Sequence, residues 1–180
     1  MTSAEGVGKT SIIVTLVSET FPRGSVSKTY HPVIISSDLY MLPINTSTVL
    51  LDSSCKPRHA IIALALREEE QNTDGEIERA HVIVLVYDVN NIECIKRLKS
   101  HWIPRILRIN DKVRDNYTIH TMKIPIILVG NKVDLRSSQH DTSDLESQLN
   151  PYFLEYKQVE MGIECSAKGY MNLIDVVYCA

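Results

Sequence analysis

The chain has 180 residues, 44% of them hydrophobic, and a formal net charge of −3 at pH 7. This length and composition fit one globular domain with a sizeable core, so we expect a single domain over residues 1–180. The sequence has no excess of Lys and Arg, which makes nucleic acid an unexpected partner.

The first motif, in residues 6–11, has the glycines, lysine and hydroxyl groups of the second half of a phosphate-binding P-loop. Its glycines would let backbone N–H groups approach phosphate, Lys9 would reach the terminal phosphates, and Thr10 would offer a hydroxyl to Mg²⁺. The apolar residues that follow predict a helix whose N-terminus faces the anion. The candidate nucleotide-binding residues are Gly6, Val7, Gly8, Lys9, Thr10 and Ser11. A plain turn is the alternative for this motif taken alone.

Two short strands are expected next, in residues 33–42 and 48–51, with a hairpin turn at residues 43–45. Asp52 would stand at the end of the second strand. Residues 56–74 hold a short apolar run followed by a run of acidic residues. This segment reads either as an insertion that packs somewhere or is disordered, or as a partner-binding helix.

Residues 81–87 and 124–129 are near-continuous apolar runs, which is the pattern of parallel strands covered on both faces. Between them, apolar residues from Ile92 to Ile106 recur at helical intervals and predict a long amphipathic helix. A further strand is expected over residues 159–165, and a last helix begins near Tyr170. Strands that alternate with helices indicate an α/β architecture.

The most informative motif is N-K-V-D, in residues 131–134, directly after the second apolar run. A carboxylate at Asp134 can accept hydrogen bonds from N1–H and the 2-amino group of guanine, a pair of donors that adenine does not offer. Asn131 would tie the loop to neighbouring backbone, and the aliphatic stem of Lys132 would lie over the base. Farther on, the loop formed by Ser166, Ala167 and Lys168 would present the Ala167 N–H to guanine O6.

Taken together, these motifs resemble the small GTPases and, within them, the N-terminal GTPase domain of mitochondrial Rho (Miro) proteins. The resemblance covers most of the chain from Gly6 to Ala180. Besides the P-loop, it rests on Tyr87-Asp88-Val89-Asn90-Asn91, Trp102-Ile103-Pro104, Leu128-Val129-Gly130-Asn131-Lys132 and Glu164-Cys165-Ser166-Ala167-Lys168. It implies a Ras-like P-loop fold with a mostly parallel sheet flanked by helices, and GTP or GDP with Mg²⁺ as cofactors. Asp52 would join Thr10 at the metal, in its outer shell.

The chain departs from this family at its start. Only five residues precede Gly6, so the strand that relatives have before the P-loop is expected to be truncated, and the domain is expected to be cut short at both ends. The first glycine of the P-loop pattern would fall on Ser3, where positive φ costs energy.

Both switch regions also depart from the family. Val33 stands where a threonine would meet Mg²⁺ and the γ-phosphate, and Thr29 or Ser36 would substitute only after a shift of the loop. Cys55 replaces a glycine, and Lys56 replaces the glutamine that would orient the attacking water. Lys9 and Lys56 are the catalytic candidates, with Lys56 neutralising charge rather than orienting water, and hydrolysis is expected to be slow.

Other polar residues carry less information. The six histidines show no paired metal-ligand spacing, and residues 111–115 read as a solvated loop rather than a second base-reading motif. Cys165 reads as buried packing rather than a nucleophile. The four scattered cysteines fit a reduced compartment, and no apolar run approaches the length of a membrane helix. This segment is therefore expected to be soluble and cytosolic.

The resemblance implies a whole protein on the cytosolic face of the mitochondrial outer membrane that binds motor adaptors and regulates mitochondrial transport and distribution. Its EF-hand modules, second GTPase domain and membrane anchor are absent from these residues. Two readings stay open, a slow GTPase and a catalytically inactive pseudo-GTPase that acts as an interaction module. An adenine-nucleotide kinase would require Asp134 to have no role in base recognition.

Overall fold

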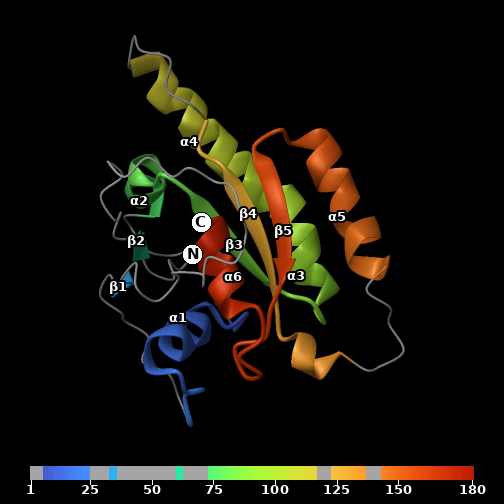
Figure 1. Ribbon diagram of the computed structural model, residues 1–180. Helices are drawn as coiled ribbons and strands as arrows, with labels where there is room; N and C mark the ends of the chain where they lie inside the picture. The colour runs from blue at the N-terminus through green and yellow to red at the C-terminus, as the bar shows by residue number, and fades with distance from the viewer. Residues whose placement is uncertain (1–5, 25–32, 36–59, 63–72, 117–122, 137–142) are drawn as a thin grey trace, which may run out of the picture.

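The computed structural model describes residues 6–24, 33–35, 60–62, 73–116, 123–136 and 143–180 (Figure 1). The elements, in chain order, are α1 (Lys9–Ser18), β1 (Val33–Ile35), β2 (Ala60–Ile62), α2 (Thr73–Arg79), β3 (Ile83–Asp88), α3 (Ile92–Arg97), the π-helical turn η2 (Leu98–Trp102), α4 (Ile103–Asn116), β4 (Ile126–Asn131), the 3-10 turn η3 (Val133–Leu135), α5 (Ser143–Glu155), β5 (Val159–Glu164) and α6 (Leu173–Cys179). None of the helices in these residues is long and apolar enough to cross a membrane.

Strands β3, β4 and β5 form a parallel sheet in that order, with Leu85 beside Leu128 and Leu128 beside Gly162. The expected α/β fold with a parallel sheet flanked by helices is therefore confirmed. Every residue of β4 is buried, as an apolar run covered on both faces requires. Because the strands are parallel, their last residues, Asp88, Asn131 and Glu164, lie at the same edge of the sheet. Ligands of open parallel sheets bind at that edge.

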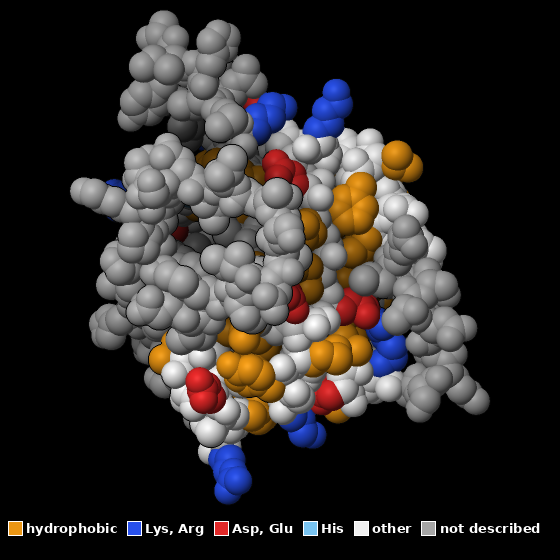
Figure 2. All heavy atoms as spheres, viewed as in Figure 1, with side chains coloured by type: hydrophobic (Ala, Val, Ile, Leu, Met, Phe, Trp, Pro, Cys, Tyr) orange, Lys and Arg blue, Asp and Glu red, His pale blue; other side chains and the backbone are white. Residues whose placement is uncertain are grey.

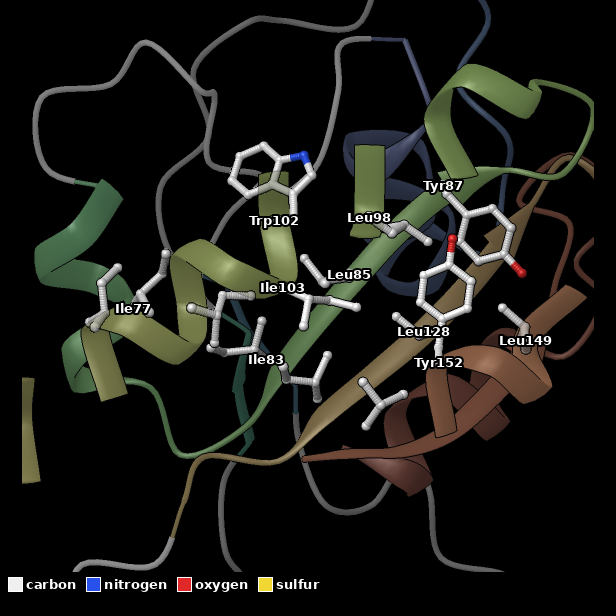
Figure 3. Packing of buried hydrophobic residues seen from close by; sticks show 14 residues of the cluster. Ile77, Ile83, Leu85, Tyr87, Leu98, Trp102, Ile103, Leu128, Leu149 and Tyr152 are labelled. Carbon is white, nitrogen blue, oxygen red and sulfur yellow. The ribbon is translucent and has the colours of Figure 1, made fainter. Parts of the chain in front are cut away.

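Alternate residues of the strands face two separate hydrophobic clusters, because successive side chains point to opposite faces. One cluster packs the sheet against α2, α3, η2, α4 and α5, and Trp102 and Tyr152 belong to it (Figure 3). The other packs the opposite face against α1 and α6, and there Val86 and Val129 meet Leu16 and Val176. Figure 1 shows α1 and α6 together on one side of the sheet, and α3, α4 and α5 on the other.

A second, antiparallel sheet pairs β1 with β2, and Val33 lies opposite Ile62. The strand expected to start at residue 33 is confirmed over its first three residues. The rest of the expected hairpin, residues 36–51, lies outside the described residues. The partner strand comes from the segment expected to be an insertion, so residues 60–62 are a strand rather than part of a helix.

The long amphipathic helix is present as α3, η2 and α4 in succession. It continues to Asn116, so the expectation of a loop at residues 111–115 was wrong. The charged residues of that segment mislead, because exposed positions such as Asp111 and Lys112 lie on the solvent side of a helix whose other side is buried. The sequence reading missed α2 and also α5, which contains Pro151.

Acidic, basic and hydrophobic side chains are interspersed on the face seen in Figure 2, where the coloured Lys and Arg side chains are scattered. Large hydrophobic residues are partly exposed in and beside α6, among them Tyr170, Met171, Ile174 and Tyr178.

Candidate functional site

The P-loop motif forms the entry to α1. Gly6 and Gly8 have φ angles of 78° and 91°, in the left-handed region that glycine adopts at low cost. Gly8 caps the helix, and its carbonyl accepts a hydrogen bond from the Ile12 N–H at 2.9 Å. Lys9, the first helical residue, is 7% exposed, and Thr10 and Ser11 are partly buried in the first turn. The first N–H groups of a helix have no partner within it, so this end suits an anion.

Asn131 connects three segments that are distant in sequence. Its Nδ2 donates to the Val7 carbonyl at 2.9 Å, and its Oδ1 accepts from the Ala167 N–H at 3.1 Å. The side chain is 1% exposed, so these bonds are made away from water. The predicted tie between this residue and neighbouring backbone is present, and it fixes the P-loop relative to the loop of Ser166 and Ala167.

Asp134 lies at the exposed end of this arrangement, in η3. Its Oδ1 accepts a hydrogen bond from the Ser166 Oγ at 2.6 Å, and that Oγ accepts one from the Gly169 N–H at 2.8 Å. Asp134 Oδ2 makes no hydrogen bond with another described residue. Among the described residues, the carboxylate is therefore held by one oxygen only.

The remaining predicted base contacts differ in their surroundings. Lys132 has a left-handed φ of 69°, and its Nζ lies 2.8 Å from Asp88 Oδ2. Lys168 is exposed. The Ala167 N–H, expected to face guanine O6, donates instead to Asn131 inside the protein. A base carbonyl at this place would have to share that donor or displace Asn131 from it.

Burial and hydrogen bonds shift the pKa of several groups around the site. Burial, and then the charge of Glu164, raise the pKa of Cys165 to about 12 and also raise that of the Tyr87 phenol. Cys165 is 0% exposed, which supports its reading as packing. Burial alone would raise the pKa of Asp88, but hydrogen bonds from Lys132 and the Asn90 N–H outweigh it, so that pKa lies below its ordinary value.

Four polar residues around η3 received no role in the sequence analysis, namely Asp88, Asn90, Arg136 and Glu164. Asn90 Nδ2 donates to the Lys132 carbonyl at 3.0 Å, and Arg136 pairs with both oxygens of Glu164. The available signal was position, since Asp88 directly follows an apolar run and Glu164 lies near the end of the predicted strand over residues 159–165.

The predicted metal ligands are only partly described. Thr10 is in place at the start of α1, whereas Asp52 and Lys56 lie outside the described residues, as do Thr29, Ser36 and Cys55. Within the described ranges no group of three or more His, Cys, Asp or Glu side chains is arranged to hold a metal ion. A divalent cation here would therefore depend on the Thr10 hydroxyl, on residues outside those ranges and on the phosphates of a bound nucleotide.

Comparison with known proteins identifies the family of the chain. The family model of the Ras family matches residues 2–179. The protein named Mitochondrial Rho GTPase 1 from Mycosarcoma maydis is 32% identical over 174 residues, which are 97% of this chain and 20% of that protein. The protein of the same name from Cryptococcus neoformans var. neoformans serotype D is 34% identical over 176 residues, which are 98% of this chain and 22% of that protein. The chain thus spans about a fifth of the length of these curated relatives. It belongs to the Ras family, as a GTPase domain whose curated relatives are mitochondrial Rho GTPases.

Proposed function

We propose that this domain binds GTP and GDP with selectivity for guanine. The observation that carries the proposal is the Asn131 side chain, which joins the P-loop to the Ala167 loop while Ser166 holds Asp134. Ras-family domains bind guanine nucleotides, and this arrangement supports a role for the Asp134 carboxylate in reading the base and for the start of α1 in binding the phosphates. The residues assigned to the base are Asn131, Lys132, Asp134, Ser166, Ala167 and Lys168.

The phosphates would lie at the start of α1. The positive φ angles of Gly6 and Gly8 turn the backbone there, and Lys9 would supply a positive charge to the terminal phosphates. Gly6, Val7, Gly8, Lys9, Thr10 and Ser11 form this part of the proposed site. Mg²⁺ would take the Thr10 hydroxyl directly and Asp52 through its outer shell.

We further propose that the domain hydrolyses the bound GTP slowly. Ras-family small GTPases are generally GTP hydrolases. Lys9 would neutralise charge on the transferring phosphoryl group, but Lys56 stands where a glutamine would position water. Water that is poorly positioned reacts slowly even when the phosphates are well bound.

A pseudo-GTPase that acts as an interaction module is the second candidate. Val33, Cys55 and Lys56 favour it, because none of them offers the metal ligand, the glycine or the water-orienting amide of an active switch. In this case the nucleotide would stabilise one conformation without being consumed.

Calorimetry on the purified chain tests nucleotide binding. GTP and GDP should bind in the presence of Mg²⁺ at least about a hundredfold more tightly than ATP and ADP, because adenine leaves the Asp134 carboxylate unpaired. Equal affinities for the guanine and adenine nucleotides would refute the proposed function.

Single-turnover kinetics separate the two candidates. The chain is loaded with GTP, and phosphate release is followed alongside the Lys9→Ala variant at matched occupancy. Slow release by the natural chain that Lys9→Ala abolishes supports the GTPase. Release no faster than that from free GTP supports the interaction module.

We also propose a cellular role from the relatives. They are named Mitochondrial Rho GTPase 1. From the resemblance to the mitochondrial Rho family, the whole protein would act at the cytosolic face of the mitochondrial outer membrane and regulate mitochondrial transport and distribution, with motor adaptors as partners. Live imaging of mitochondria after deletion of the gene, with return of the natural or Lys9→Ala sequence, tests this role. Unchanged mitochondrial distribution after deletion would contradict it.

A further inference from the structure

Two carboxylates lie on either side of β4, the strand that leads into residues 132–136. We call these residues the base-reading turn, because they contain Asp134. Asp88, the last residue of β3, lies beside Asn131 in the β3–β4 register. Glu164, the last residue of β5, lies beside Gly130 in the β4–β5 register. The two strands that flank β4 therefore both end in an acidic residue, and each acid lies level with the last two residues of β4, just before Asp134.

Asp88 holds the start of the turn. Its Oδ2 lies 2.8 Å from Lys132 Nζ, while its Oδ1 accepts a hydrogen bond from the Asn90 N–H at 2.9 Å. Asn90 in turn donates from Nδ2 to the Lys132 carbonyl at 3.0 Å. Lys132 is thus fixed through its side chain and its backbone, which offsets the cost of a left-handed φ in a residue other than glycine.

Glu164 holds the end of the turn. Arg136 Nη1 donates to Glu164 Oε2 at 2.9 Å, and Arg136 Nη2 donates to Oε1. The Arg136 and Glu164 side chains are 16% and 12% exposed, so this two-point contact is largely shielded from water. Glu164 also directly precedes Cys165 and Ser166, and its carbonyl accepts a hydrogen bond from Asn172 Nδ2 at 2.9 Å.

We propose that Asp88 and Glu164 are positioning residues for guanine recognition, which hold Lys132 and Arg136 so that the carboxylate of Asp134 between them meets the 2-amino group of the base. This inference rests on the proposed function. Neither acid needs to touch the nucleotide. Each acts through a cation that lies two residues from Asp134 on one side or the other.

Inosine diphosphate provides the test, because hypoxanthine keeps N1–H and O6 but lacks the 2-amino group. The ratio of IDP to GDP dissociation constants therefore measures the contact between that amino group and Asp134. Asp88→Asn and Glu164→Gln remove charge with little change of shape. In each variant the preference for GDP over IDP should fall by about three- to tenfold, since a charge-assisted hydrogen bond is weakened.

Arg105→Met is the matched control. Arg105 is 17% exposed and its Nη2 lies 2.6 Å from Asp74, which is 53% exposed, so this variant breaks a more exposed ion pair, between α4 and α2, that has no contact with residues 132–136. Its preference for GDP over IDP should equal that of the natural chain. Thermal melting of all three variants reports loss of stability separately.

The outcomes are distinct. Equal losses of GDP and IDP affinity in Asp88→Asn and Glu164→Gln, with their ratio unchanged, would overturn the inference and assign both residues a purely structural role. If one variant does not fold, the ratio in the other decides. A natural chain that prefers GDP neither to IDP nor to ADP would instead refute the proposed function.

Discussion

At the scale of single residues, the site depends on polar groups that are satisfied inside the protein. Asn131 is the clearest case, because one buried amide pairs with a carbonyl of the P-loop and an N–H of the Ala167 loop. A buried backbone group that loses its partner costs about 1–3 kcal/mol. The residue that organises the site therefore also contributes to stability without any ligand.

Asn131→Ala should lower the free energy of unfolding by about 2–4 kcal/mol, since it leaves the Val7 carbonyl and the Ala167 N–H unpaired. Urea denaturation without nucleotide measures the change. Asn172→Gly is the control, because it removes an exposed hydrogen bond and tolerates the positive φ of that position. The control should cost less than about 1 kcal/mol. Equal effects of the two variants would contradict the central place given to Asn131.

Cys165 should be unreactive in the folded chain. Burial raises its pKa to about 12, so at pH 8 only about one thiol in ten thousand is a thiolate, and the side chain is 0% exposed. Iodoacetamide at pH 8 should alkylate Cys165 at least about a hundredfold faster in urea than in buffer, as peptide mass spectrometry can follow. Equal rates in the two solvents would show that the thiol is accessible and that its assignment to packing is wrong.

At the scale of elements, the start of helix α1 packs closely against the C-terminal end of β4 at Gly8. A Cβ placed on Gly8 would clash with Asn131 Nδ2, and the φ of Gly8 is 91°. Asn131 is fixed by its other bonds and cannot withdraw without losing them. The P-loop residues and the end of β4 are therefore coupled by close packing as well as by hydrogen bonds.

Gly8→Ala should lower GDP affinity by at least about tenfold and destabilise the chain by about 2–4 kcal/mol, because backbone strain and a clash act together. Gly24→Ala is its matched control, since φ there is 110° but no described residue lies within 4 Å of the added atom. That variant should show backbone strain alone, about 1–2 kcal/mol, with GDP affinity unchanged. Calorimetry and urea denaturation of both variants measure these effects. A Gly8→Ala variant that binds GDP like the natural chain would contradict the coupling.

The elements that could be predicted from sequence are those with a strong local signal. The runs that became β3 and β4 are apolar throughout, and the helix from Ile92 shows apolar residues at helical spacing. Helix α5 escaped prediction because it carries an internal proline, Pro151. Strand β2 escaped because three residues gain their strand conformation from pairing with β1, which is a long-range contact.

At the scale of the whole molecule, two clusters of hydrophobic residues pack on the two faces of the parallel sheet. The parallel pairing places the C-terminal ends of its three strands at one edge. The sequence motifs predicted which residues would meet there, because Asn131, Asp134, Ser166 and the P-loop do converge. They did not predict that Asn131 would take the Ala167 N–H, or that Asp88 and Glu164 would bracket the turn. Those contacts depend on the register between strands, and the near-continuous apolar runs of β3 and β4 lack the alternation that would specify it.

The central claim is that the Asp134 carboxylate selects guanine. Competition of GDP and ADP against a fluorescent guanine nucleotide, in the natural chain and in Asp134→Ala, tests it most directly. Asp175→Ala, which removes an exposed carboxylate on α6, is the control. We predict that the natural chain and the control prefer GDP to ADP by at least about a hundredfold, and that Asp134→Ala loses most of this preference. ADP that competes as well as GDP in the natural chain, or selectivity that survives in Asp134→Ala, would contradict the account.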